Sequence, residues 1–98
     1  MDQITLNGTV YPLKPLTFGQ LRDNEATVNA YTAPEDGISA LEHTKRAVAV
    51  LQVALGPIDP VVFDASSPGE LSQAALDTMH LTYKRPVGEG DGQAPANA

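Results

Sequence analysis

The sequence predicts an α+β domain that is mostly α: an N-terminal β-hairpin packed on about three helices, followed by a flexible C-terminal tail. An Asn-Gly pair separates two β-prone runs near the start, and capping residues precede three apolar periodic segments. The end of the chain carries almost no large apolar side chain. With 98 residues the chain suffices for one small domain, which we expect at residues 1–86, with the tail at 87–98.

Residues 3–12 are predicted to form the β-hairpin. A two-residue type I′ turn needs φ > 0 at both central positions, which Asn7 and Gly8 supply. The cross-strand pairs are then Leu6–Thr9, Thr5–Val10 and Ile4–Tyr11. One face carries Ile4, Leu6, Thr9 and Tyr11, and the other carries Thr5 and Val10. Because an isolated hairpin is marginal in water, we expect its more apolar face to pack on the helices.

The first helix is predicted over about residues 18–31. Thr17 is a good N-cap, and Gln20 three positions later completes a capping box. Leu16 before the cap and Leu21 after it fit a hydrophobic staple. Turn-forming residues at 33–37 end this segment.

The second helix is predicted over residues 39–55 and is expected to be the core helix. Ser39 and Glu42 form a second capping-box pattern, and Glu42 lies four residues before Arg46 in the favourable order for an ion pair. Its apolar stripe comprises Leu41, Thr44, Val48, Leu51 and Leu55. Gly56 followed by Pro57 closes the helix.

The third helix is predicted over about residues 68–84, after an extended connector. Two prolines and two acidic residues surround Val61, Val62 and Phe63, which favours an extended chain there. Ser67 is the expected N-cap of the third helix, and Pro68 takes its first position.

Composition and motifs exclude several functional classes. The formal net charge of −6 disfavours binding to nucleic acid or to an anionic membrane. The absence of cysteine removes disulfides, thiolate nucleophiles and Cys-based zinc sites. His43 is expected on the solvated side of its helix, and for His80 half-buried packing and a functional role are equally open. A metal site made from the two would lack a third and a fourth ligand, so no metal centre is predicted. We expect no enzyme, no cofactor and no metal, but a soluble cytoplasmic protein that binds other proteins.

Residues 4–22 read ITLNGTVYPLKPLTFGQLR: a strand, an Asn-Gly turn, a second strand and an entry into a helix through Thr17, Gln20 and Leu21. This segment resembles the opening of small tail assembly chaperones of long-tailed bacteriophages. The resemblance implies a chaperone of the host bacterial cytoplasm that is absent from the mature virion. It also implies two partners: the tape-measure protein, which the chaperone keeps soluble, and tail-tube subunits, which it helps to recruit.

The apolar side chains at the junctions between elements are the candidate protein-binding residues. They are Leu13, Leu16, Phe18, Val62 and Phe63. For Val62 and Phe63 a place in the small core is the competing interpretation, because a chain of this size needs its large apolar residues for packing. Two other functions stay open: a minor neck or tail subunit of the virion, and a small regulatory module that binds a protein. Self-association also stays open.

Overall fold

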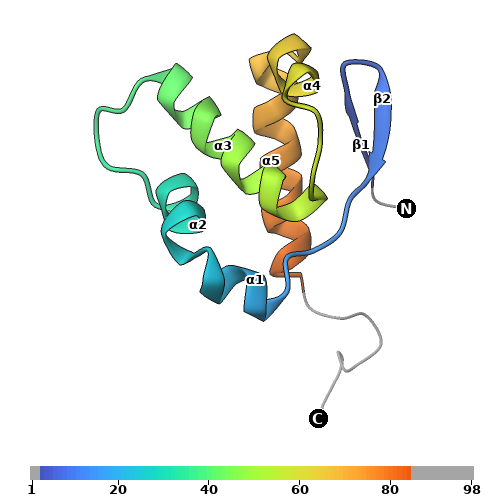
Figure 1. Ribbon diagram of the computed structural model, residues 1–98. Helices are drawn as coiled ribbons and strands as arrows, with labels where there is room; N and C mark the ends of the chain where they lie inside the picture. Colours follow the sequence, from blue (N-terminus) through green and yellow to red (C-terminus); the bar gives the residue numbers. More distant parts are fainter. Residues whose placement is uncertain (1–2, 85–98) are drawn as a thin grey trace.

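The computed structural model of the protein describes residues 3–84 and places a two-stranded antiparallel hairpin before five helices within them (Figure 1). The elements are β1 (Gln3–Leu6), β2 (Thr9–Pro12), α1 (Phe18–Asp23), α2 (Glu25–Thr32), α3 (Ala40–Leu55), α4 (Pro60–Ala65) and α5 (Pro68–Thr82). This arrangement confirms the predicted α+β, mostly helical class. The end of the predicted domain at residue 86 and the predicted tail at 87–98 lie outside the described residues.

The hairpin has the predicted register. Its pairs include Ile4–Tyr11, Thr5–Val10 and Leu6–Thr9. Asn7 and Gly8 have φ values of 49° and 81°, as a two-residue turn with positive φ requires. Ile4 and Leu6 are buried and β1 contacts α5, so the hairpin does pack its apolar face on the helices. The predicted face is only partly covered, because Thr9 is exposed and Tyr11 half-buried.

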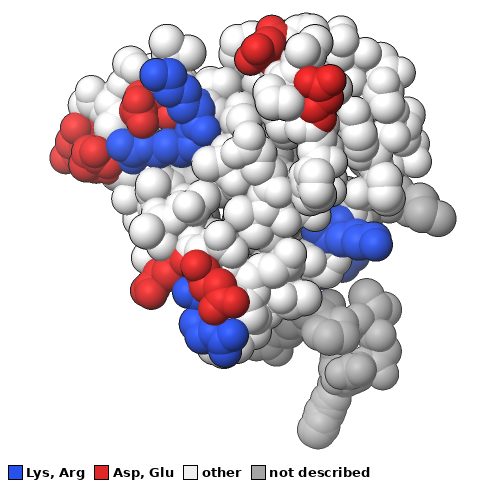
Figure 2. Space-filling view, viewed as in Figure 1, with Lys and Arg blue, Asp and Glu red and all other residues white. Residues whose placement is uncertain are grey.

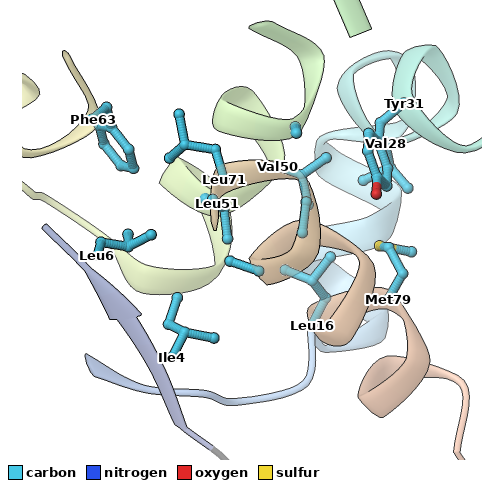
Figure 3. Close-up of a cluster of buried hydrophobic side chains, with 13 residues drawn as sticks. Ile4, Leu6, Leu16, Val28, Tyr31, Val50, Leu51, Phe63, Leu71 and Met79 are labelled. Atoms are coloured by element: carbon cyan, nitrogen blue, oxygen red, sulfur yellow. The ribbon is translucent and has the colours of Figure 1, made fainter. Parts of the chain in front are cut away.

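The hydrophobic core lies mainly between α3 and α5, which make the most extensive contact among the helices. Ala47, Val50 and Leu51 of α3 are fully buried there. The core also includes Ile4, Leu6, Leu16, Val28, Tyr31, Phe63, Leu71, Ala74, Ala75 and Met79. Figure 3 shows Ile4 and Leu6 of β1 pointing toward these helices, so β1 and the helices α2 to α5 contribute to one core.

The predicted helix starts are confirmed by hydrogen bonds. The Thr17 hydroxyl accepts from the Gln20 backbone N–H at 3.1 Å, and the Gln20 side chain accepts from the Thr17 N–H at 2.9 Å, which completes the capping box. Ser39 and Ser67 each accept from the backbone N–H three residues later, at 3.0 and 3.1 Å. At the other end of α3, Gly56 has a φ of 78°.

The predicted single helix over residues 18–31 is wrong in one respect, because the chain forms two helices that meet at Asn24. Asn24 has φ −120° and ψ 30°, and it is both the last cap of α1 and the first of α2. Its side-chain amide and its backbone N–H both donate to the Gln20 carbonyl, at 2.9 and 3.0 Å. The side-chain amide thus adds a second donor to a carbonyl that already accepts the helical N–H, and a short polar side chain that bonds the nearby backbone in this way competes with continued helix.

The predicted extended connector is also wrong, because residues 60–65 form the short helix α4. The Asp59 side chain caps this helix by accepting from the Val61 N–H at 3.0 Å. Pro60 occupies the first turn, where its missing N–H costs nothing. Pro60 therefore starts a helix here, and the side chain of Phe63 in α4 is buried in the core.

Candidate protein-binding groove

The five candidate residues do not form one exposed surface. Leu16 and Phe63 are buried in the core, at 5% and 6% exposure. Leu13 and Val62 are half-buried and pack against that core. Phe18 differs from the other four, because 76% of its surface is exposed. Phe18 and its surroundings are therefore the candidate protein-binding surface.

Phe18 lines a groove of about 410 Å³ between α1, α2 and the end of α5. Its lining consists of Phe18, Leu21, Arg22, Glu25, Val28, Asn29 and Tyr83. We call it the aromatic groove. In Figure 1 α1 and the end of α5 lie together at the lower side of the molecule, far from α4.

Two aromatic side chains border the aromatic groove and are mostly exposed. Phe18 is 76% and Tyr83 67% exposed, in a chain that has only five aromatic residues. Small domains need their aromatic side chains for the core, so the exposure of two beside one groove is unusual. Aromatic side chains that can become buried against another chain are typical of protein-binding sites.

The Thr82 hydroxyl group links the chain segments that carry the two aromatic residues. The Leu16 backbone N–H donates to the Thr82 side-chain oxygen at 2.9 Å, and the Thr82 hydroxyl donates to the Thr78 carbonyl at 2.7 Å. Leu16 lies two residues before Phe18, and Thr82 directly precedes Tyr83. These hydrogen bonds thus join the segment just before α1 to the end of α5.

The charged groups beside the aromatic groove contribute little selectivity. Arg22 and Glu25 line it, one of each sign. Arg22 forms an ion pair with Asp23 at 3.1 Å, and both side chains are about two-thirds exposed, at 64% and 68%. An exposed pair of this kind is worth at most about 1 kcal/mol. Apolar contact is therefore the main attraction that the groove offers to a ligand.

Phe18 is the one candidate residue that lines the groove, and the sequence does not mark Tyr83, the second exposed aromatic residue there. Tyr83 lies within the predicted third helix, and the structure makes it the C-cap of α5. No local pattern relates it to Phe18, because the two residues meet only through the contact between distant helix ends. A large aromatic residue at a helix end, next to Lys84, is the one available signal of exposure.

A second groove, of about 350 Å³, lies between α3, α4 and the start of α5. Its lining consists of Leu41, Thr44, Lys45, Val48, Phe63, Asp64, Ser66, Pro68 and Leu71. We call it the α3–α4 groove. In Figure 2 charged side chains gather near the α2–α3 connection, over α4 and over α1, with an uncharged surface between them.

Arg46 is the most connected charged residue of the described chain. Its guanidinium donates to both carboxylate oxygens of Glu35, at 2.7 and 3.0 Å, and to the Ala30 carbonyl at 3.0 Å. It also meets Glu42 at 3.3 Å, which confirms the ion pair predicted from the sequence. The hydrogen bonds from Arg46 lower the pKa of Glu35 to about 2. These contacts join α2, the following loop and α3, and they have a structural role.

The two histidines differ from their predicted environments. His43, expected on the solvated side, is half-buried and stacks on Tyr31 with ring centroids 5.1 Å apart. Burial raises the pKa of Tyr31, and the negative charge of Asp77 raises it further. His80 is exposed rather than half-buried. Within residues 3–84, no three His, Asp or Glu side chains lie together as a metal ion would need.

Comparisons with known protein families, with curated proteins and with solved structures find no significant match. Among the described helices, none combines the length and apolar composition needed to cross a bilayer.

Proposed function

We propose that this protein is a phage tail assembly chaperone that binds the tape-measure protein, keeps it soluble and helps to recruit tail-tube subunits. The resemblance of residues 4–22 to such chaperones gives the proposal its family. The observation that carries the binding role is the aromatic groove, where Phe18 and Tyr83 are 76% and 67% exposed.

The groove suits an amphipathic helix as its ligand. Such helices insert apolar side chains spaced three or four residues apart into an apolar groove of another protein. Phe18 and Tyr83 would contact such side chains, together with Leu21 and Val28, which also line the groove. A tape-measure protein is expected to be long and largely helical, so it would present many such segments before the tail tube encloses it.

The charge of the chain supports the same role. A formal net charge of −6 makes copies of the protein repel one another and favours solvation. A helix covered by such copies would carry acidic surfaces outward while its apolar face is buried. As the resemblance implies, the chaperone would act in the host cytoplasm during assembly and would be absent from the finished virion.

Co-expression with the tape-measure protein tests this function. The wild-type chain is expected to raise the soluble fraction of the tape-measure protein and to copurify with it. The variant Phe18→Ala/Tyr83→Ala removes both aromatic rings from the groove and is expected to lose most of this effect. Val10→Ala is the matched control, because Val10 is 53% exposed but does not line the groove.

Circular dichroism of each variant shows whether the fold is retained. A folded double variant that solubilises the tape-measure protein as well as the wild type does would contradict the proposal. Recovery of the protein from purified, washed virions at a fixed stoichiometry would favour a structural neck or tail subunit instead. A tight complex with a regulatory protein, and none with the tape-measure protein, would favour the third interpretation.

A further inference from the structure

The apolar stripe of α3 is covered over only part of its length. The sequence predicts a continuous stripe that includes Leu41, Val48 and Leu51. Leu51 is fully buried and Val48 half-buried, but Leu41 at the start of the helix is 65% exposed. The uncovered part of the stripe forms one wall of the α3–α4 groove, so this groove has apolar surface that the described chain does not fill.

The α3–α4 groove also carries one charge of each sign on opposite walls. Lys45 belongs to α3 and Asp64 to α4, and both side chains are exposed. Within residues 3–84, neither takes part in an ion pair. The neighbouring cation of α3, Arg46, does not line the groove and is paired with Glu35 and Glu42.

We propose that the α3–α4 groove is the interface of a homodimer, in which Leu41 of each copy packs in the groove of the other. In a two-fold interface, a contact of residue i with residue j is always repeated as a contact of j with i. A Lys45–Asp64 ion pair between copies would therefore form twice. A second copy presents Asp64 to Lys45 and Lys45 to Asp64, so the groove is self-complementary in charge. A partner whose charges are all of one sign would repel one of these two residues.

The net charge of the chain makes this local complementarity necessary. Two copies that each carry −6 repel one another, so a stable contact must lie where that repulsion is offset. The α3–α4 groove is such a place, because the opposite charges of Lys45 and Asp64 cancel beside apolar surface. The interface is distinct from the aromatic groove, and the inference does not depend on the proposed chaperone function.

Sedimentation velocity over micromolar to millimolar concentrations of the purified chain tests the dimer. The wild type is expected to change from monomer to dimer as its concentration rises. Leu41→Gln and the single charge reversals Lys45→Glu and Asp64→Lys are each expected to weaken dimerisation about tenfold or more. The double variant Lys45→Glu/Asp64→Lys restores the ion pair with exchanged partners and is expected to recover most of the affinity.

Asp36→Lys is the matched charge control. It changes the net charge by the same amount as Asp64→Lys, but Asp36 lies in the exposed α2–α3 connection and not in the groove. Both Asp36→Lys and Asp64→Lys reduce the negative charge of the chain. If only the general repulsion between copies mattered, both variants would dimerise more strongly than the wild type. Weaker dimerisation of Asp64→Lys but not of Asp36→Lys therefore identifies the specific contact.

Several results would overturn the dimer. They are a wild type that stays monomeric at millimolar concentration, a double variant no better than the single ones, and a dimer that Leu41→Gln leaves unchanged. Phe18→Ala separates the two proposals, since it is expected to weaken binding of the tape-measure protein while the dimer persists. Circular dichroism of every variant excludes loss of the fold as the cause of a change.

Discussion

Replacing Thr82 by valine removes the hydroxyl that joins the start of α1 to the end of α5. Valine keeps the shape and the β-branch of threonine, so the χ1 restriction within α5 stays nearly the same. The Leu16 N–H, which donates to this oxygen at 2.9 Å, loses its partner in a half-buried position. The Thr78 carbonyl loses one donor but keeps its helical hydrogen bond.

The expected cost follows from the orphaned N–H of Leu16. A buried donor without a partner costs about 1–3 kcal/mol, and partial burial of this one places the loss near the lower end, at about 1–2 kcal/mol. Total stability of a domain of this size is about 5–15 kcal/mol, so the loss is measurable. We expect Thr82→Val to lower the free energy of unfolding by this amount.

Thr78→Val is the matched control for this experiment. Thr78 is fully buried, but its hydroxyl donates only to the Ala74 carbonyl of its own helix, at 2.9 Å. Its removal leaves no N–H without a partner, so a loss below about 1 kcal/mol is expected. Urea unfolding followed by circular dichroism at 222 nm measures both variants. Equal losses, or a larger loss for the more buried Thr78, would refute the reasoning.

Three further substitutions test the core, the end of α3 and the Arg46 cluster. Leu51→Ala creates a cavity at a fully buried position and is expected to cost about 2–5 kcal/mol in urea unfolding. Gly56→Ala forces a φ of 78° with ψ −159°, a region that only glycine adopts readily, and should cost about 1–3 kcal/mol in the same assay. The pKa of Glu35 is about 2, below its ordinary value of 4.5. Its ion pair with Arg46 therefore stabilises the fold fully above pH 4.5, and this stabilisation is lost as the pH falls through about 2. Thermal unfolding should accordingly show a small deficit of Glu35→Gln at neutral pH that shrinks toward pH 2; a constant deficit would contradict this sign.

The parts of the fold that follow from local chemistry could be predicted from the sequence. Asn7 and Gly8 determine the turn, and the turn determines the strand register, because a two-residue loop leaves no other pairing. The caps at Thr17, Ser39 and Ser67 are equally local, since each involves a side chain and a backbone N–H three residues away.

The two wrong predictions, one continuous helix over residues 18–31 and an extended chain at 60–65, involve residue types that occur in more than one local structure. Asn24 is acceptable within a helical pattern, and its backbone angles, φ −120° and ψ 30°, show that one helix ends there and another starts. Pro60 favours an extended chain in the sequence pattern, but proline equally suits the first turn of a helix, which is its place in the structure. Distinguishing these cases requires the backbone angles, which depend on how α4 packs Phe63 against the core.

The candidate site could be predicted only in part, because burial depends on contacts between distant segments. Phe18 and Phe63 each lie at a junction between predicted elements, with Leu16 two residues before Phe18 and Val62 directly before Phe63. The structure buries Phe63 and leaves Phe18 exposed beside Tyr83. Nothing within a few residues of Phe18 indicates that the end of α5 lies next to it.

Photo-crosslinking at position 18 tests the central claim most directly. A photoreactive phenylalanine analogue replaces Phe18 in cells that co-express the tape-measure protein, and the same analogue in place of Val10 is the control. The account predicts a covalent adduct with the tape-measure protein from position 18 and little from position 10. Equal adducts from both positions, or none from position 18 while the two proteins still copurify, would contradict the assignment of the aromatic groove as the binding site.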